Sequence, residues 1–154
     1  MAYSKEAVLG AIADCSDPKK LKIWIANARR EQVPDIERAA IDRLIEVSAI
    51  NNHDHTDEPV VLDFWRSIIS LEFVLSDENG KTTRLSRTRQ KIARVGVKKT
   101  LQDLVLLATP SEGYNLLRDR GMLDMSAEAV VLRHPAEFDA QVLAAAKNRA
   151  AQNE

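Results

Sequence analysis

Apolar residues recur every three to four positions along most of this chain, and no segment shows sustained alternation of apolar and polar residues. This spacing follows Ser4, which can cap a first helix, and it continues over about 19–30 and about 34–51. Such a pattern places apolar side chains on one face of an α-helix. The first third of the chain is therefore predicted to form three helices.

The pattern stops at a polar stretch, from Asn51 to Pro59, that contains no aliphatic residue. Polar segments of this kind between periodic segments are typical of loops. The sequence therefore predicts an N-terminal helical module over 1–51, a polar linker over 52–59 and a main helical domain over 60–154.

The segment 60–76 is apolar almost throughout. At about 100° per residue, its polar residues fall on one narrow stripe of the predicted helix. These residues are Asp63, Arg66, Ser67 and Ser70. A helix with so little polar surface is expected at the centre of the fold.

The remaining segments also predict helices. We expect a basic helix over about 83–95, closed by Gly96, and then a helix over 101–108 capped by Thr100, with Asp103 as its capping-box partner. Further helices are expected after Pro110, after Ser126 and from Pro135 onward. The predicted fold is all-α: a compact bundle of about eight or nine short helices, in which the N-terminal module joins a larger helical body.

Composition agrees with a globular helical protein. Hydrophobic residues make up 45% of the chain and charged residues 29%, with five glycines and five prolines. Cys15 is the only cysteine, so no internal disulfide can form. The first residues show no basic region followed by a long apolar core, and no apolar run approaches about 20 residues. We therefore expect no signal peptide and a cytoplasmic protein without membrane contact.

Charge is distributed very unevenly. The segment 81–99 contains eight basic residues and no acidic residue, whereas the rest of the chain carries 14 basic and 23 acidic residues. The net charge of −1 conceals this asymmetry. The basic segment is therefore the candidate binding surface of the molecule.

If a helix began at Arg84, four cations would lie within an arc of about 80°. These four are Arg84, Arg87, Lys91 and Arg94, and Lys98 and Lys99 follow them closely in the chain. Arginine suits phosphate oxygens, and cations that contact phosphates release condensed counterions. We therefore expect these six residues to contact the phosphate backbone of a nucleic acid, DNA rather than RNA.

Two other interpretations of the basic segment stay open. Its charges could be compensated by acidic residues elsewhere in the same chain. Alternatively, the basic helix could dock on an acidic surface of another protein. The N-terminal module of a second copy, expected to be acidic, is one such surface, which would make the protein a homo-oligomer. The segment 84–108 also has the outline of a helix–turn–helix, but its glycine spacing is short and its second helix is too apolar for a major groove.

Two charged residues occupy positions expected to be apolar. Glu72 falls among the apolar residues of the predicted 60–76 helix, and Arg89 lies on the apolar side of the basic helix. An unpaired buried carboxylate is costly. We therefore predict that Glu72 and Arg89 form a structural ion pair between the two helices.

Catalytic and metal signatures are weak. The loop 53–58 holds His53, His55 and three acidic residues, but metal sites usually use cysteines or histidines spaced along a helix. There is no glycine-rich phosphate loop and no nucleophile elbow. We expect no cofactor, no resident metal and no catalysis.

The sequence therefore favours a non-catalytic cytoplasmic protein that binds nucleic acid or associates with it. The alternative is an adaptor or oligomerising protein. A third hypothesis, a metal-dependent hydrolase, would require the loop 53–58 to be ordered against Asp63 or another acid.

Overall fold

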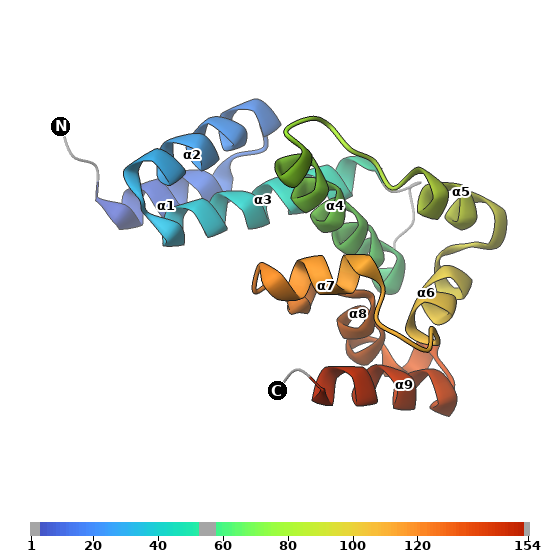
Figure 1. The fold of residues 1–154 in the computed structure, drawn as a ribbon. Coiled ribbons are helices and arrows are strands. Elements are labelled where there is room, and N and C mark those ends of the chain that lie inside the picture. Colours follow the sequence, from blue (N-terminus) through green and yellow to red (C-terminus); the bar gives the residue numbers. More distant parts are fainter. Residues whose placement is uncertain (1–3, 53–57, 153–154) are drawn as a thin grey trace. The chain divides into compact units, whose positions relative to one another are not determined.

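The computed structural model describes residues 4–52 and 58–152. Over these residues the chain forms nine α-helices, two 3₁₀ helices and no strand, which confirms the all-α prediction (Figure 1). Contacts between residues divide the chain into two compact units, Met1–Asn52 and His53–Glu154. Residues 53–57 of the predicted linker lie outside the described residues, so the linker stays a prediction.

The first unit is a group of three helices in which α1 and α2 both pack on α3. Their bounds are α1 Lys5–Asp14, α2 Pro18–Glu31 and α3 Pro34–Asn52. The expected cap at Ser4 is present: the Ser4 hydroxyl accepts a hydrogen bond from Ala7 N at 3.1 Å. Asp17 accepts one from Lys19 N at 3.0 Å, and Pro18 takes the first helical position.

The second unit contains the other elements. They are α4 Pro59–Asn79, α5 Ser86–Val95, α6 Val97–Val105, α7 Glu112–Asp119, the 3₁₀ helix η1 Leu123–Met125, α8 Ala127–Arg133, the 3₁₀ helix η2 Pro135–Glu137 and α9 Ala140–Ala151. Helix α4 packs against α6, α7, α8 and η1, as expected for the central helix (Figure 1). Its apolar side chains Phe64, Ile68 and Val74 are buried.

The narrow polar stripe of α4 is itself largely buried. Asp63 is 7% exposed, Ser67 1% and Ser70 0%, while Arg66 is half-buried. The Ser70 hydroxyl donates to the Arg66 carbonyl one turn earlier, at 2.7 Å. The stripe therefore faces the packed side of α4, where a buried carboxylate needs cationic partners.

The basic segment folds differently from the sequence prediction. Helix α5 begins at Ser86, with Leu85 as its N-cap, so Arg84 precedes the helix and a single helical row of four cations does not form. Gly96 has φ 89° and ψ 169°, and helix α6 starts at the next residue. A side chain strongly disfavours this backbone conformation, which glycine adopts readily.

The predicted capping box at Thr100 is also wrong. Because α6 already begins at Val97, Thr100 lies inside the helix, and its hydroxyl donates to the Gly96 carbonyl at 2.8 Å. Asp103 therefore does not act as a capping-box partner.

The C-terminal helices largely follow their sequence signals. Ser111, Ser126 and Asp139 cap α7, α8 and α9, each accepting a backbone N–H three residues on. The last helix begins at Ala140 rather than at Pro135, because Pro135 starts the separate turn η2. Within residues 4–52 and 58–152, no helix has both the length and the apolar character to cross a membrane.

Candidate nucleic-acid interface

Helix α5 is fixed to α4 through the carboxylate of Glu72. Arg89 donates to it twice, from Nε to Oε2 and from Nη2 to Oε1, both at 2.7 Å. The backbone N–H of Leu85, the N-cap of α5, donates to Oε2 at 2.9 Å. The predicted pair of Glu72 and Arg89 is therefore present, and the same carboxylate also holds the start of the basic helix.

Arg89 also lies over the ring of Trp65, with 5.2 Å between its guanidinium carbon and the ring centroid. Trp65 and Glu72 are seven residues apart on α4, which places them on one face of the helix. The hydrogen bonds that Arg89 donates to Glu72 raise the pKa of Arg89, against the opposing effect of burial. Arg89 thus helps to hold the inner side of α5 through its ion pair and its contact with the Trp65 ring. The opposite, outward face of that helix is exposed.

That outward face of α5 carries Arg87, Gln90 and Arg94, all exposed. On a helix they fall within an arc of about 60°, and the two arginines are about 10 Å apart along the axis. Arg84, just before the helix, is exposed as well. None of the three arginines has an ion pair or a side-chain hydrogen bond with any residue that the structure describes.

The three lysines of the predicted site are engaged by acids of the same unit. Lys91 on α5 and Lys99 on α6 both contact the Asp103 carboxylate, at 2.6 Å and 3.0 Å. Lys98 contacts Glu137 at 2.5 Å and Glu58 at 3.8 Å. The structure therefore splits the predicted site into three unpaired arginines and three paired lysines.

The pKa values follow these contacts. Hydrogen bonds from Lys91 and Lys99 lower the pKa of Asp103, and the hydrogen bond with Glu137 raises the pKa of Lys98. Both shifts favour the charged forms of Asp103 and Lys98. The hypothesis that acidic residues of the same chain compensate the basic segment therefore holds for these lysines and for Arg89. It does not hold for the three exposed arginines.

One part of the oligomer hypothesis needs correction. Residues 1–52 carry eight basic and eight acidic residues, so the N-terminal unit has no net charge. The excess of acids lies instead in the same unit as the basic segment, outside 81–99. Net charge therefore gives the N-terminal unit of a second copy no advantage as a partner for α5.

An open pocket of about 210 Å³ lies beside the exposed face of α5, between that helix and α6. Its lining combines basic, hydroxyl, acidic and apolar side chains. The lining residues are Arg87, Thr88, Lys91, Thr100, Asp103, Leu104 and Leu107. The pocket thus brings one of the unpaired arginines, Arg87, beside Lys91 and Asp103.

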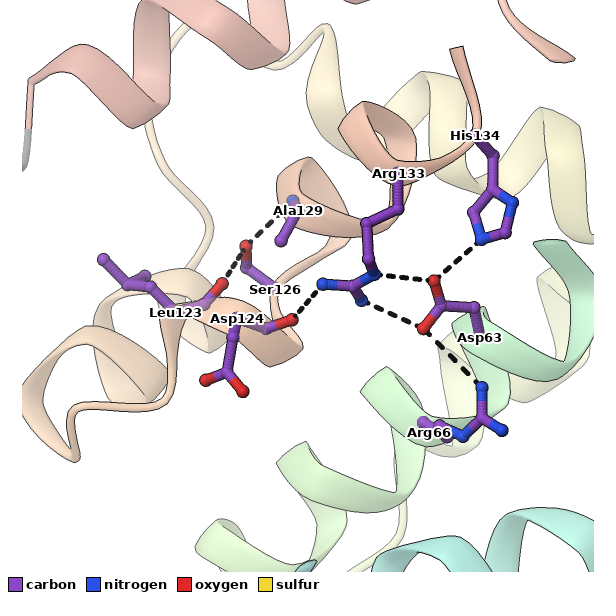
Figure 2. A network of polar contacts seen from close by, with 8 residues as sticks. All are labelled: Asp63, Arg66, Leu123, Asp124, Ser126, Ala129, Arg133 and His134. Carbon is purple, nitrogen blue, oxygen red and sulfur yellow. Dashed lines mark hydrogen bonds and ion pairs between the residues drawn. The ribbon is translucent and has the colours of Figure 1, made fainter. Parts of the chain in front are cut away.

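A second polar network, absent from the sequence predictions, surrounds Asp63 (Figure 2). Arg133 at the end of α8 donates to both of its oxygens, at 2.8 and 2.9 Å, and His134 Nε2 lies 2.8 Å from Oδ2. Arg66 approaches Oδ1 at 3.9 Å, and Arg133 donates further to the Asp124 carbonyl at 2.7 Å. The network joins α4 to α8 and η1.

This environment keeps Asp63 ionised. Burial raises the pKa of the Asp63 carboxyl, but the hydrogen bonds from Arg133 and His134 outweigh it, and the pKa lies below its usual value. The His134 ring thus lies against a carboxylate that is 71 positions away in the sequence. The network therefore has a structural role, in which it ties α8 and η1 to α4.

Metal ligands do not gather in the part of the chain that the structure describes, where no three His, Cys, Asp or Glu side chains converge. The candidate ligands His53, Asp54, His55 and Asp57 lie outside the described residues. Glu58, the last residue of that loop, contacts Lys98. The hydrolase hypothesis therefore gains no support from the residues that are described.

Comparisons with known proteins add no further constraint. No protein-family model, curated protein or solved structure matches this chain. The functional argument rests on the side chains themselves.

Proposed function

We propose that this protein is a non-catalytic nucleic-acid-binding protein that contacts the phosphate backbone through Arg84, Arg87 and Arg94. One observation carries the proposal: these three arginines are exposed and have no acidic partner among the described residues. The other cations of the predicted site, by contrast, have acidic partners. An unpaired guanidinium can contact phosphate without first losing an internal ion pair.

The way α5 is held also supports this proposal. Glu72, Arg89 and Trp65 attach the inner side of α5 to the central helix, so the outer side presents its arginines from a fixed helix. Gln90 lies between Arg87 and Arg94 and adds a hydrogen-bond donor. Contacts of this kind position a protein on a duplex but carry little sequence information, so the proposed binding is of low sequence specificity.

The test is binding of a fluorescently labelled DNA duplex over a salt series, for wild type and for Arg87→Glu/Arg94→Glu. Wild type is expected to bind with a log–log salt slope of about −2 to −3, because each phosphate contact contributes about 0.9. The double variant should lose most of this binding at every salt concentration. Duplex RNA is measured in parallel and is expected to bind more weakly.

The matched control is Arg118→Glu/Lys147→Glu, which makes the same change in net charge at exposed positions of α7 and α9. This variant should keep most of the affinity of wild type. Equal losses in both double variants would show that only net charge matters. The absence of wild-type binding at low salt would refute the proposal.

A second candidate function, a protein-binding adaptor, is supported by three exposed apolar residues near the same helices. Val95 is 40% exposed, Leu106 41% and Leu107 47%, and Leu107 also lines the pocket beside α5. Apolar side chains mixed with arginine are typical of protein interfaces. Salt-sensitive self-association without duplex binding in the same series would favour this function.

A further inference from the structure

Two lysines from different helices converge on one carboxylate in the pocket between α5 and α6. Lys91 Nζ lies 2.6 Å from Asp103 Oδ2, and Lys99 Nζ lies 3.0 Å from Oδ1. Each carboxylate oxygen therefore has its own ammonium group. The Asp103 side chain remains 30% exposed, so solvent and ligands can reach this arrangement.

The same pocket contains donors that the carboxylate does not use. Arg87 lines it and has no ion pair with a described residue, and the hydroxyl of Thr88 has no hydrogen-bond partner among the described residues. Lys91 also lines the pocket, and Lys99 contacts the Asp103 carboxylate from beside it, so three cations surround one acid. Such an excess of positive charge around an open pocket favours an anion.

A phosphodiester resembles the Asp103 carboxylate in the features that this site recognises. Both carry a single negative charge, and both present two terminal oxygens that accept charge-assisted hydrogen bonds. The carboxylate therefore occupies the lysines in the way that a backbone phosphate would. A phosphate that approaches Arg87 meets two lysines whose charge Asp103 has already partly neutralised.

We infer that the pocket lined by Arg87, Lys91 and Asp103, with Lys99 bound to the same Asp103 carboxylate, is a subsite for a backbone phosphate, in which Asp103 is an internal competitor that lowers affinity. This inference rests on the proposed function, since it assigns one phosphate contact of the proposed interface. It adds a role for Asp103, which limits how tightly the surface holds a polyanion. Removal of the Asp103 charge releases Lys91 and Lys99 for the ligand.

The experiment compares duplex binding by the full chain and by Asp103→Asn over the same salt series. The variant is expected to bind about tenfold more tightly at low salt, and its log–log slope should be steeper by about one to two, because two ammonium groups become available. The matched control is Asp119→Asn, an exposed Asp→Asn change on α7. Circular dichroism checks that the variants retain their helices.

A cycle of variants separates the release of these lysines from a general change in charge. In the background Lys91→Gln/Lys99→Gln, the Asp103→Asn change should give no more affinity than Asp119→Asn gives. An undiminished gain in that background would overturn the inference.

A competition with inorganic phosphate distinguishes the two sources of this anion. At constant ionic strength, millimolar phosphate should leave duplex binding by Asp103→Asn unchanged, because a single phosphate contact is weak without the rest of the polymer. Displacement of the duplex at that concentration would assign the pocket to free phosphate and overturn the inference.

The outcomes also separate this inference from the proposed function. If wild type binds and Asp103→Asn binds no better than Asp119→Asn, the proposed function stands and the inference fails. If only Asp103→Asn binds, the subsite is supported and the proposed function of the wild-type chain fails. If no variant binds duplex at low salt, both fail.

Discussion

At Asp63, one buried carboxylate accepts hydrogen bonds from Arg133 and His134, and the stability of the second unit should depend on its charge. Replacement by asparagine keeps the shape of the side chain but leaves Arg133 without its ionic partner. We expect Asp63→Asn to lower the free energy of unfolding by about 2–3 kcal/mol at pH 7. Urea unfolding followed by circular dichroism measures this loss.

The same substitution predicts a pH dependence with a definite sign. Because the pKa of Asp63 in the folded protein lies below its usual value of 3.8, its contribution is complete above that pH. The contribution is lost as the pH falls through the lower, folded-state pKa. The difference in unfolding free energy between wild type and Asp63→Asn should therefore be smaller at pH 3 than at pH 5. A difference that grows toward pH 3 would contradict the assignment.

Individual residues also show what could be predicted from the sequence. The Glu72–Arg89 pair could be predicted because both residues stand at apolar positions of helices that follow one another in the chain. Asp63 and Arg133 are 70 positions apart, and their meeting depends on how α8 packs on α4. The pairing of Lys98 with Glu137 has the same origin, and helical periodicity contains no information about it.

At the scale of elements, the junction of α5 and α6 depends on a single glycine. Gly96 has φ 89° and ψ 169°, which a residue with a Cβ rarely adopts, although the space around it is open. Its N–H donates to the Ile92 carbonyl at 2.8 Å, and its own carbonyl accepts from Thr100. The cost of a side chain there would therefore come from the backbone rather than from a clash.

We expect Gly96→Ala to lower the free energy of unfolding by about 1–3 kcal/mol. Gly10→Ala is the control, because Gly10 lies inside α1 with open space around it and should gain up to about 1 kcal/mol. Thermal unfolding of both variants provides the comparison. A neutral Gly96→Ala would mean that α6 does not need this turn to start at Val97.

Element types could be predicted here, whereas element boundaries could not all be predicted. Caps at Ser4, Asp17 and Ser126 lie where side-chain chemistry places them, because these signals are local. The start of α5 was predicted three residues too early, since Thr83 is held outside the helix by Ser76 of α4, whose hydroxyl accepts the Thr83 N–H at 2.8 Å. A contact with another element thus decided where the helix begins.

At the scale of the whole molecule, the residues proposed to bind nucleic acid belong to one of the two compact units. Arg84, Arg87, Arg94 and Asp103 all lie in the unit His53–Glu154. That unit has its own buried apolar residues and its own ion pairs, among them Glu128 with Arg149 at 3.0 Å between α8 and α9. Its stability should therefore not require the first unit.

We predict that a fragment of residues 53–154 folds alone and binds duplex DNA within about twofold of the full chain, with the same salt slope. The reason is electrostatic: residues 1–52 carry equal numbers of basic and acidic residues, so their removal leaves the net charge of the molecule unchanged. Circular dichroism with urea unfolding tests the folding, and the salt series tests the binding. A folded fragment with a much smaller salt slope would place phosphate contacts on the first unit, which carries eight basic residues. An unfolded fragment would instead show that the two units depend on each other for stability.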